Sequence, residues 1–150
     1  MRPGGPQMLR SSGEIMGMAV LQHESERPKI LLGNATMKFT VSVAAVALQH
    51  MVPFTIENPY NSLIWEAPSM KWLMARREVT FVRADFCQFG VPWQKSTRVV
   101  GGHLDLQWVA TRCHRHGGRC SKSGRPHVAL QGVHSSGIFM TALAEAYPIN

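Results

Sequence analysis

Apolar segments of helical length and of strand length alternate along the middle of the chain, and this order restricts the possible fold. Residues 38–51 are apolar nearly all round and rich in alanine, which predicts a buried helix. The short apolar run 52–56 predicts a fully buried strand of the parallel kind. Residues 62–78 predict helix on both sides of Pro68, and two further strands are predicted at 78–86 and 97–102. Helices and strands in this order predict an open α/β sheet.

The segments outside this pattern are less regular. A chain of 150 residues is the length of one domain, and 45% hydrophobic residues fit a globular protein. We expect one partial domain over 1–150, with its α/β core at 38–112. The remaining segments are predicted as a loop at 1–13, a weak helix at 14–27 interrupted by Gly17, a short helix at 103–113, and a basic Cys/His-rich loop at 113–137 within a mostly irregular region.

The charge of the chain is positive and unevenly placed. Sixteen Lys and Arg against nine Asp and Glu give a formal charge of +7. The densest basic run contains no acid and consists of Arg112, Arg115, Arg119, Lys122 and Arg125. A polyanion such as DNA is the natural partner of such a field, and a solvated basic loop is the alternative.

The cysteines and the apolar runs bear on the cellular compartment. Three cysteines are an odd number, and residues 1–13 have Pro and Gly where a secretory signal needs an apolar core. We expect reduced thiols and an intracellular protein, without distinguishing nucleus from cytoplasm. The longest apolar run, around 41–48, is too short to span a bilayer, so no membrane partner is predicted.

A carboxylate stands where the strand at 52–56 is predicted to end. In open α/β sheets, ligands bind in the crevice beyond the carboxyl ends of the strands, and Glu57 follows such an end. Pro59 biases Asn58 toward an extended conformation, so the chain cannot turn directly into a helix. We therefore expect Glu57 at the rim of the crevice as a functional group. The alternative is that it caps the next segment or pairs with a lysine.

Two stretches of sequence resemble a known family. The stretches ENPYNSLIW and CQFGVPWQKSTR, at 57–65 and 87–98, are similar in order and spacing to the middle of the catalytic domain of cytosine-5 DNA methyltransferases. The closer likeness is to a divergent branch with a Glu-Asn-Pro motif and a Lys-x-Thr in place of spaced arginines. LRSSGEIMG and LLGN also resemble the segment upstream of the acidic strand. The resemblance covers most of residues 9–112.

This resemblance implies a fold and a chemistry. The fold would be part of a Rossmann-like, class I methyltransferase-type open sheet with flanking helices and a loop-rich C-terminal region. In the family a flipped cytosine is attacked at C6 by a cysteine thiolate, and S-adenosylmethionine supplies the methyl group. Glu57 would contact the base at N3 and the exocyclic amine, with Asn58 supporting it. The residues that would meet the base pocket and the DNA backbone are Gln94, Lys95, Thr97 and Arg98.

The sequence also departs from the family. It has neither the Gly-rich donor loop that binds S-adenosylmethionine nor a Pro-Cys nucleophile. Cys87 lies at the end of the second strand, where a packed, apolar role is expected rather than catalysis. We therefore expect the latter part of a catalytic domain, inactive by itself.

A second group of residues suggests a metal. The segment CHRHGGRC brings cysteine and histidine close together in sequence, and His127 follows it. These residue types bind zinc, although their spacing matches none of the paired Cys-x-x-Cys patterns. The predicted ligands are Cys113, His116, Cys120 and His127, and the alternative is a mobile basic loop. The competing function is a non-catalytic module, with or without a stabilising zinc, that binds nucleic acid through residues 95–98 and 112–127, including Arg115 and Arg119.

Overall fold

The computed structural model describes residues 7–144, apart from the side chains of His116 and Leu143. Its longer elements are α1 (Arg27–Gln49), β1 (Phe54–Pro59), α2 (Pro68–Met74), β2 (Val79–Asp85), β3 (Ser96–Gly102) and α3 (Met140–Leu143). Short 3-10 helices lie at η1 (Glu24–Glu26), η2 (Leu63–Glu66), η3 (Phe86–Phe89), η4 (Gln107–Val109) and η5 (His116–Gly118).

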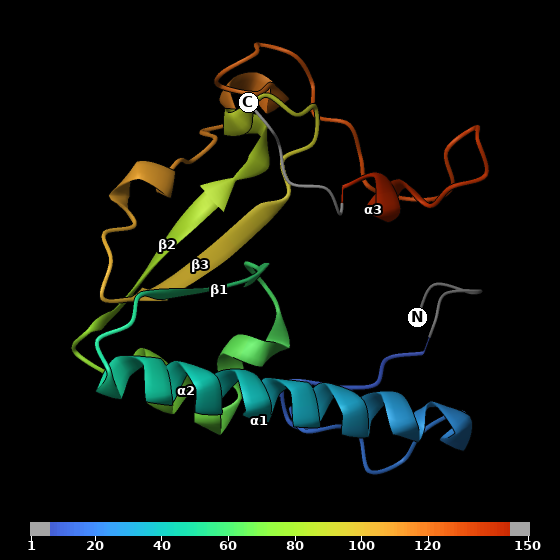
Figure 1. Ribbon diagram of the computed structural model, residues 1–150. Coiled ribbons are helices and arrows are strands. Elements are labelled where there is room, and N and C mark those ends of the chain that lie inside the picture. The colour runs from blue at the N-terminus through green and yellow to red at the C-terminus, as the bar shows by residue number, and fades with distance from the viewer. Residues whose placement is uncertain (1–6, 145–150) are drawn as a thin grey trace. The chain divides into compact units, whose positions relative to one another are not determined.

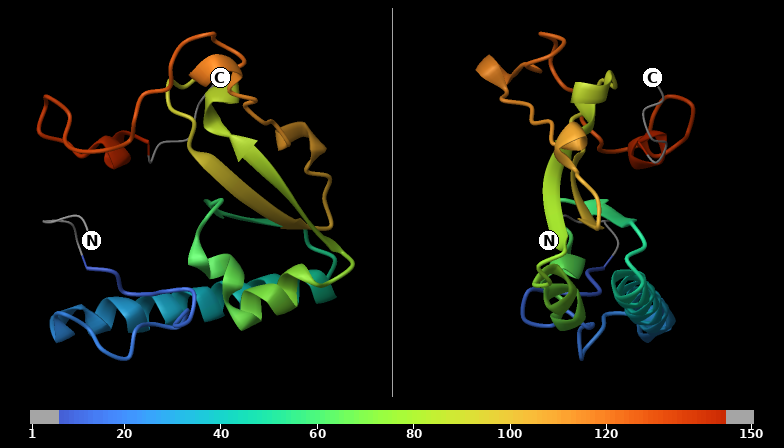
Figure 2. Two further views of the ribbon diagram at one scale, coloured as in Figure 1. Left: turned by 180° about the vertical axis from the view of Figure 1, so that it is seen from behind. Right: turned by 60° about the vertical axis from the view of Figure 1, so that its left-hand side comes forward.

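The three strands form an open antiparallel sheet in the order β1-β3-β2 (Figures 1 and 2). Since β3 runs against both neighbours, β1 and β2 point the same way but do not pair with each other. The prediction of an open α/β sheet is confirmed, whereas the prediction of a parallel strand pairing is wrong. The connections explain the pairing. The ten residues that link β2 to β3 contain no α-helix, so β3 returns antiparallel beside β2. Helix α2 lies in the connection from β1 to β2, and these two strands are not neighbours in the sheet.

The first strand ends later than the sequence predicts. β1 continues through Glu57 and Asn58 to Pro59, and the Tyr60 amide donates to the Ser96 carbonyl at 2.9 Å. Glu57 is therefore half-buried inside a strand and does not stand at its end. The extended bias that Pro59 places on Asn58 prolongs the strand, which corrects the prediction of a carboxylate at a rim.

The chain divides into two compact units, each described by itself. The described part of the first unit comprises residues 7–55, 61–80 and 101–104, and that of the second comprises 56–60, 81–100 and 105–144. In the first unit, α1 and α2 contact each other (Figure 1). Its core includes Ile30, Met37, Trp65, Met70 and Leu73.

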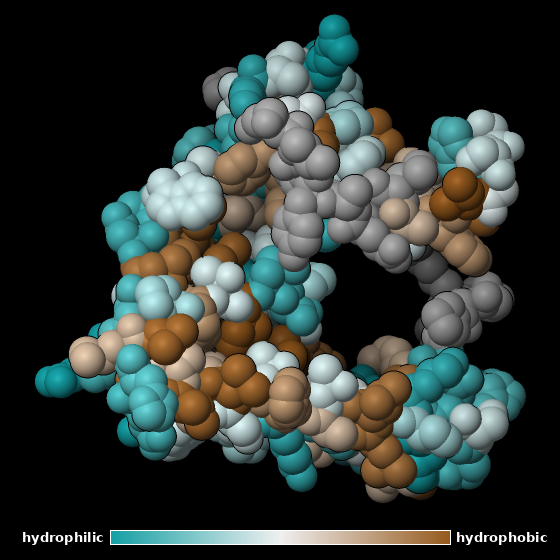
Figure 3. Space-filling view, viewed as in Figure 1, coloured by the Kyte–Doolittle hydropathy of each residue, from teal (hydrophilic) through white to brown (hydrophobic). Residues whose placement is uncertain are grey.

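Helix α1 differs from the prediction in extent and in burial. It begins at Arg27, with a proline in its first turn, whereas residues 14–23, predicted as part of a weak helix, have no helical structure. Gly17 has φ +120°, and a Cβ there would lie 2.3 Å from the Ile30 side chain, so this position requires glycine. Much of the apolar surface of α1 is exposed, including Leu31, Leu32, Phe39, Val43 and Val46, and Figure 3 shows hydrophobic patches along this helix. The predicted helix is confirmed, and its predicted burial is wrong.

Within the described residues, one helix is long and apolar enough to cross a membrane by length and composition alone. It spans Glu24–Gln49, with a mean hydropathy of 1.5 in an 18-residue window of which 22% is buried. Core helices of soluble proteins and signal sequences meet the same criterion. The prediction considered the apolar run around 41–48 alone, and the helix that contains this run is longer.

The later part of the chain has few regular elements, as predicted. Residues 114–137 contain η5 and isolated bridges, which confirms the predicted loop. The short helix predicted at 103–113 is reduced to the three residues of η4. The predicted helix on both sides of Pro68 is present as η2 and α2.

Candidate metal centre

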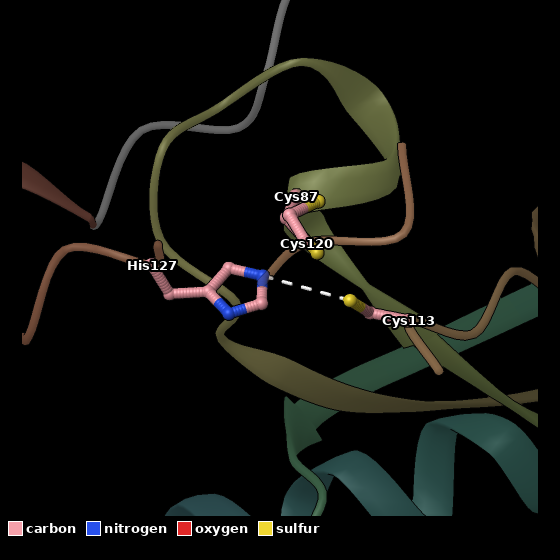
Figure 4. A group of neighbouring side chains, drawn as sticks. All are labelled: Cys87, Cys113, Cys120 and His127. Carbon is pink, nitrogen blue, oxygen red and sulfur yellow. Dashed lines mark hydrogen bonds between the residues drawn. The ribbon is translucent and has the colours of Figure 1, made fainter. Parts of the chain in front are cut away.

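Three cysteines and one histidine of the second unit come together around a common point. Cys87 lies in η3 directly after β2, Cys113 follows η4, and Cys120 and His127 flank a tight turn. Their sulfur and ring nitrogen atoms all lie within 4.8 Å of one another. Figure 4 shows the imidazole of His127 directed at the three sulfur atoms. The cysteines are buried, and all three are free thiols rather than disulfides.

One distance within this Cys3His cluster agrees with a tetrahedral zinc ion. With Zn–S bonds of about 2.3 Å and Zn–N bonds of about 2.0–2.1 Å, a tetrahedral site separates sulfur from nitrogen by about 3.6 Å. The distance from Cys113 Sγ to His127 Nε2 is 3.6 Å. Thiolate and imidazole are the ligands that structural zinc sites use. The cluster could therefore hold a metal such as zinc.

Asp85, at the end of β2, fixes the position of Cys113. This carboxylate is fully buried, and its Oδ2 accepts a hydrogen bond of 2.8 Å from the Cys113 amide. Its other donors are the Ser96 hydroxyl at 2.6 Å, the Gln94 amide at 3.2 Å and the Arg83 guanidinium at 3.1 Å. One side chain thus joins the end of β2, the start of β3 and the segment that carries Cys113. Because Cys87 is two residues after Asp85, the same contact brings Cys113 toward Cys87.

The turn after Cys120 presents backbone N–H groups to its sulfur. The Gly124 amide donates to the Cys120 carbonyl at 2.9 Å, and the Cys120 amide donates to the Arg125 carbonyl at 2.8 Å. Gly124 has φ +68°, which favours glycine. This turn brings the chain back from Cys120 toward His127, and so places two ligands seven residues apart at one point.

The surroundings of the thiols act differently on their ionisation. Burial raises the pKa of Cys87 to about 12, and the neighbouring sulfurs of Cys113 and Cys120 add to this effect. Burial also opposes ionisation of Cys120, but the backbone N–H groups of Ser123 and Lys122 outweigh it and lower its pKa to about 6.

The pKa of Cys113 is shifted in the same direction as that of Cys120. Burial opposes its ionisation, whereas hydrogen bonds that include the Ser121 amide at 3.4 Å lower its pKa below the usual value. The surroundings therefore favour ionisation of Cys113 and Cys120 and oppose ionisation of Cys87. A cation held by the cluster would favour loss of the Cys87 proton, since coordinated thiols are deprotonated.

The predicted ligand set overlaps with this cluster in three positions. Cys113, Cys120 and His127 are brought together as predicted, and the fourth member is Cys87. The side chain of His116, the predicted fourth ligand, lies outside the described part of the structure. Sequence reasoning missed Cys87 because it lies 26 positions before Cys113 in the sequence. The available signal was the third cysteine itself, which completes a Cys3His set.

The residues predicted to bind nucleic acid differ from one another in their contacts and in their burial. Gln94 donates to Asp85 and accepts a hydrogen bond from Arg115 Nε. The Lys95 ammonium lies 4.7 Å from the centre of the Phe86 ring. Thr97 is fully buried, so its hydroxyl does not face solvent.

The other predicted site residues lie as follows. Arg98 is half-buried, and its guanidinium lies over the Tyr60 ring at 4.9 Å. Arg119 is exposed and donates to the Gly124 carbonyl at 3.2 Å. Glu57 and Asn58 are half-buried in β1, and one carboxylate oxygen of Glu57 is shielded from solvent.

The excess of basic over acidic side chains is larger in the second unit than in the first. Its described residues include eight Lys and Arg and three acids, a difference of +5, and one of the acids is the buried Asp85. The exposed basic residues on the segment that contains three of the four cluster residues are Arg112, Arg115, Arg119, Lys122 and Arg125.

Comparison with known proteins gives no family assignment. No protein-family model, no curated protein and no solved structure matches this chain. The site is therefore interpreted from its own geometry.

Replacing Asp85 tests its role in holding the centre. We expect Asp85→Asn to lower the free energy of unfolding by about 2–3 kcal/mol. The carboxylate accepts hydrogen bonds at both oxygens, whereas the NH2 group of Asn would be a donor placed against other donors. Urea denaturation at pH 7 measures this loss. Glu24→Gln removes a surface carboxylate whose side chain is 65% exposed, and we expect no measurable change.

The same contact predicts a pH dependence. Burial acts to raise the pKa of Asp85, but hydrogen bonds from Ser96, Cys113, Arg83 and Gln94 outweigh it and lower the pKa. The stabilisation is therefore complete above the ordinary carboxyl pKa and is lost as pH falls through the lower, folded value. The stability difference between wild type and Asp85→Asn should shrink in acid, and a constant difference would contradict this assignment.

Proposed function

We propose that this chain contains a zinc-stabilised, non-catalytic module that binds nucleic acid. The observation that carries the proposal is the buried Cys3His cluster, held on the same loops as an exposed run of basic residues. Thiolate ligands require a reducing compartment, so we place the module inside the cell.

The ligand set supports a structural role for the metal. Four protein ligands fill a tetrahedral zinc site, whereas catalytic zinc keeps one position for water or substrate. The three cysteines are buried, which further limits access to the ion. The segment 113–127 contains little regular structure, so a bound metal would supply much of its stability.

The charge distribution supports a polyanionic partner. Lys and Arg side chains neutralise phosphates and release counterions, which supplies most non-specific affinity for nucleic acid. The exposed Arg115, Arg119 and Arg125 lie within a segment that two or more of the proposed ligands hold in place. Binding of nucleic acid would thus depend on the metal through the position of these loops.

Metal content tests the first part of the proposal. We expect about one zinc ion per chain to survive dialysis in purified wild-type protein, measured by elemental mass spectrometry. Cys87→Ser and Cys120→Ser should each reduce the retained zinc strongly, because three ligands bind zinc more weakly than four. His134→Asn is the matched control, since His134 is exposed and contacts Ser136 instead of the cluster. Full zinc retention by both cysteine variants would refute the site.

Charge removal tests the second part. We expect the double variant Arg119→Gln/Arg125→Gln to weaken binding to a duplex and to reduce the slope of log K against log salt by about 1–2, because each lost phosphate contact removes about 0.9 from the slope. Lys38→Gln/Arg76→Gln removes the same charge from the exposed surface of the first unit and should leave the slope unchanged. Equal effects of the two variants would show that only the net charge matters.

A second candidate is a cytosine-5 DNA methyltransferase-like fragment with a Rossmann-like origin. It is favoured by the sheet order, because β1, which carries Glu57 and Asn58, lies beside β3, which follows Gln94 and Lys95. The residues present do not fit S-adenosylmethionine, since the sequence has no Gly-rich donor loop, and we derive no methyl transfer from them. In the binding assay above, this candidate requires Glu57→Gln to weaken binding to a duplex with a mismatched cytosine, whereas the module proposal requires no change.

A further inference from the structure

A pocket in the second unit lies beside the proposed metal centre and combines aromatic with cationic side chains. It has a volume of about 370 Å³. The residues that give it chemical character are Tyr60, Phe81, Arg83, Arg112 and His114. This volume lies near the lower end of the range of about 300–1,000 Å³ for small-molecule sites, so it suits one compact ligand.

The aromatic residues of the pocket offer flat surfaces. The side chain of Phe81 is 54% exposed, which is unusual for a large apolar residue on a central part of a strand. The Arg83 guanidinium lies 5.0 Å from the centre of the Tyr60 ring, and Arg98 lies 5.2 Å from that of Phe81. Aromatic rings and stacked guanidinium groups are the surfaces on which unpaired nucleobases stack.

Arg112 supplies positive charge to the pocket. Arg112 and His114 are exposed and lie on either side of Cys113. Among the described residues, Arg112 has no acidic partner within salt-bridge distance. A guanidinium in this position can bind a phosphate through two parallel hydrogen bonds.

The pocket and the metal centre share their supports. Asp85 accepts hydrogen bonds from the Cys113 amide and from Arg83, so it joins the segment of Arg112 and His114 to the strand that carries Phe81. A metal bound at Cys113 would hold the same segment from its other side. The pocket is therefore preorganised by the centre rather than formed by loops that move independently.

We propose that this pocket receives one unpaired nucleotide of a single-stranded nucleic acid. The base stacks on Phe81, and Arg112 binds the adjoining phosphate. The inference rests on the proposed function and makes it more specific, because a base inside a duplex is already stacked and cannot enter the pocket. The module should therefore prefer single strands over a duplex of the same length.

Fluorescence anisotropy with the zinc-loaded full chain tests this inference. The probes are a 12-nucleotide oligo(dT), a 12-nucleotide oligo(U) and a 12-base-pair DNA duplex. We expect wild type to bind at least one single strand more tightly than the duplex. Phe81→Leu keeps an apolar side chain but removes the ring, and it should weaken single-strand binding roughly fivefold to a hundredfold, as expected for the loss of one stacked base. Its affinity for the duplex should change less than twofold.

Two further variants complete the test. Phe39→Leu alters an aromatic side chain that is 70% exposed on α1, outside the pocket, and should leave all three affinities unchanged. Arg112 is exposed, so Arg112→Gln should not affect folding. This variant should weaken single-strand binding more than duplex binding. Retained zinc confirms that each variant is folded.

The outcomes separate the inference from the proposed function. If Phe81→Leu and Arg112→Gln reduce single-strand and duplex binding equally, or reduce neither, the pocket proposal is wrong while the module proposal stands. If the wild-type protein binds none of the three probes at low salt, the proposed function itself is refuted.

Discussion

The buried carboxylate of Asp85 is the contact on which the second unit depends. A charged group with no exposure is tolerated only when hydrogen bonds replace its hydration, and four residues donate to this one. These donors come from β2, from the approach to β3 and from the segment of Cys113. Removing the charge would leave several N–H groups facing each other. The strand ends and the segment of Cys113 are therefore held together by their hydrogen bonds to one carboxylate.

This contact links the metal centre, the pocket and the basic loops. Cys113 lies between Arg112 and His114, which line the pocket. The Asp85 carboxylate and the proposed zinc both position Cys113, so they also position this wall of the pocket. The exposed arginines that follow are carried by the chain between Cys113 and His127. A segment with little regular structure can present charge at defined positions when its ends are fixed in this way. On our proposals, the metal contributes to function by restricting the chain rather than by chemistry.

Sequence reasoning could predict elements whose signal is local. The alternation of apolar segments predicts a helix at 38–51, strands at 52–56, 78–86 and 97–102, and helix on both sides of Pro68. The structure has α1, β1, β2, β3, η2 and α2 at these places, with somewhat different bounds. Sequence reasoning could not give the strand pairing, because β3 inserts between β1 and β2 through contacts distant in sequence. It also misjudged Glu57, since Pro59 prolongs the strand instead of ending it. Of the metal centre, the segment 113–127 supplied three members, whereas Cys87 is joined to them only by the fold.

Zinc-edge X-ray absorption spectroscopy of the purified protein tests the central claim most directly, because it reports the atoms bound to the metal. The account predicts a four-coordinate ion with three sulfur ligands at about 2.3 Å and one nitrogen ligand at about 2.0–2.1 Å. A coordination shell of oxygen and nitrogen without sulfur, or with fewer than three sulfurs, would contradict it.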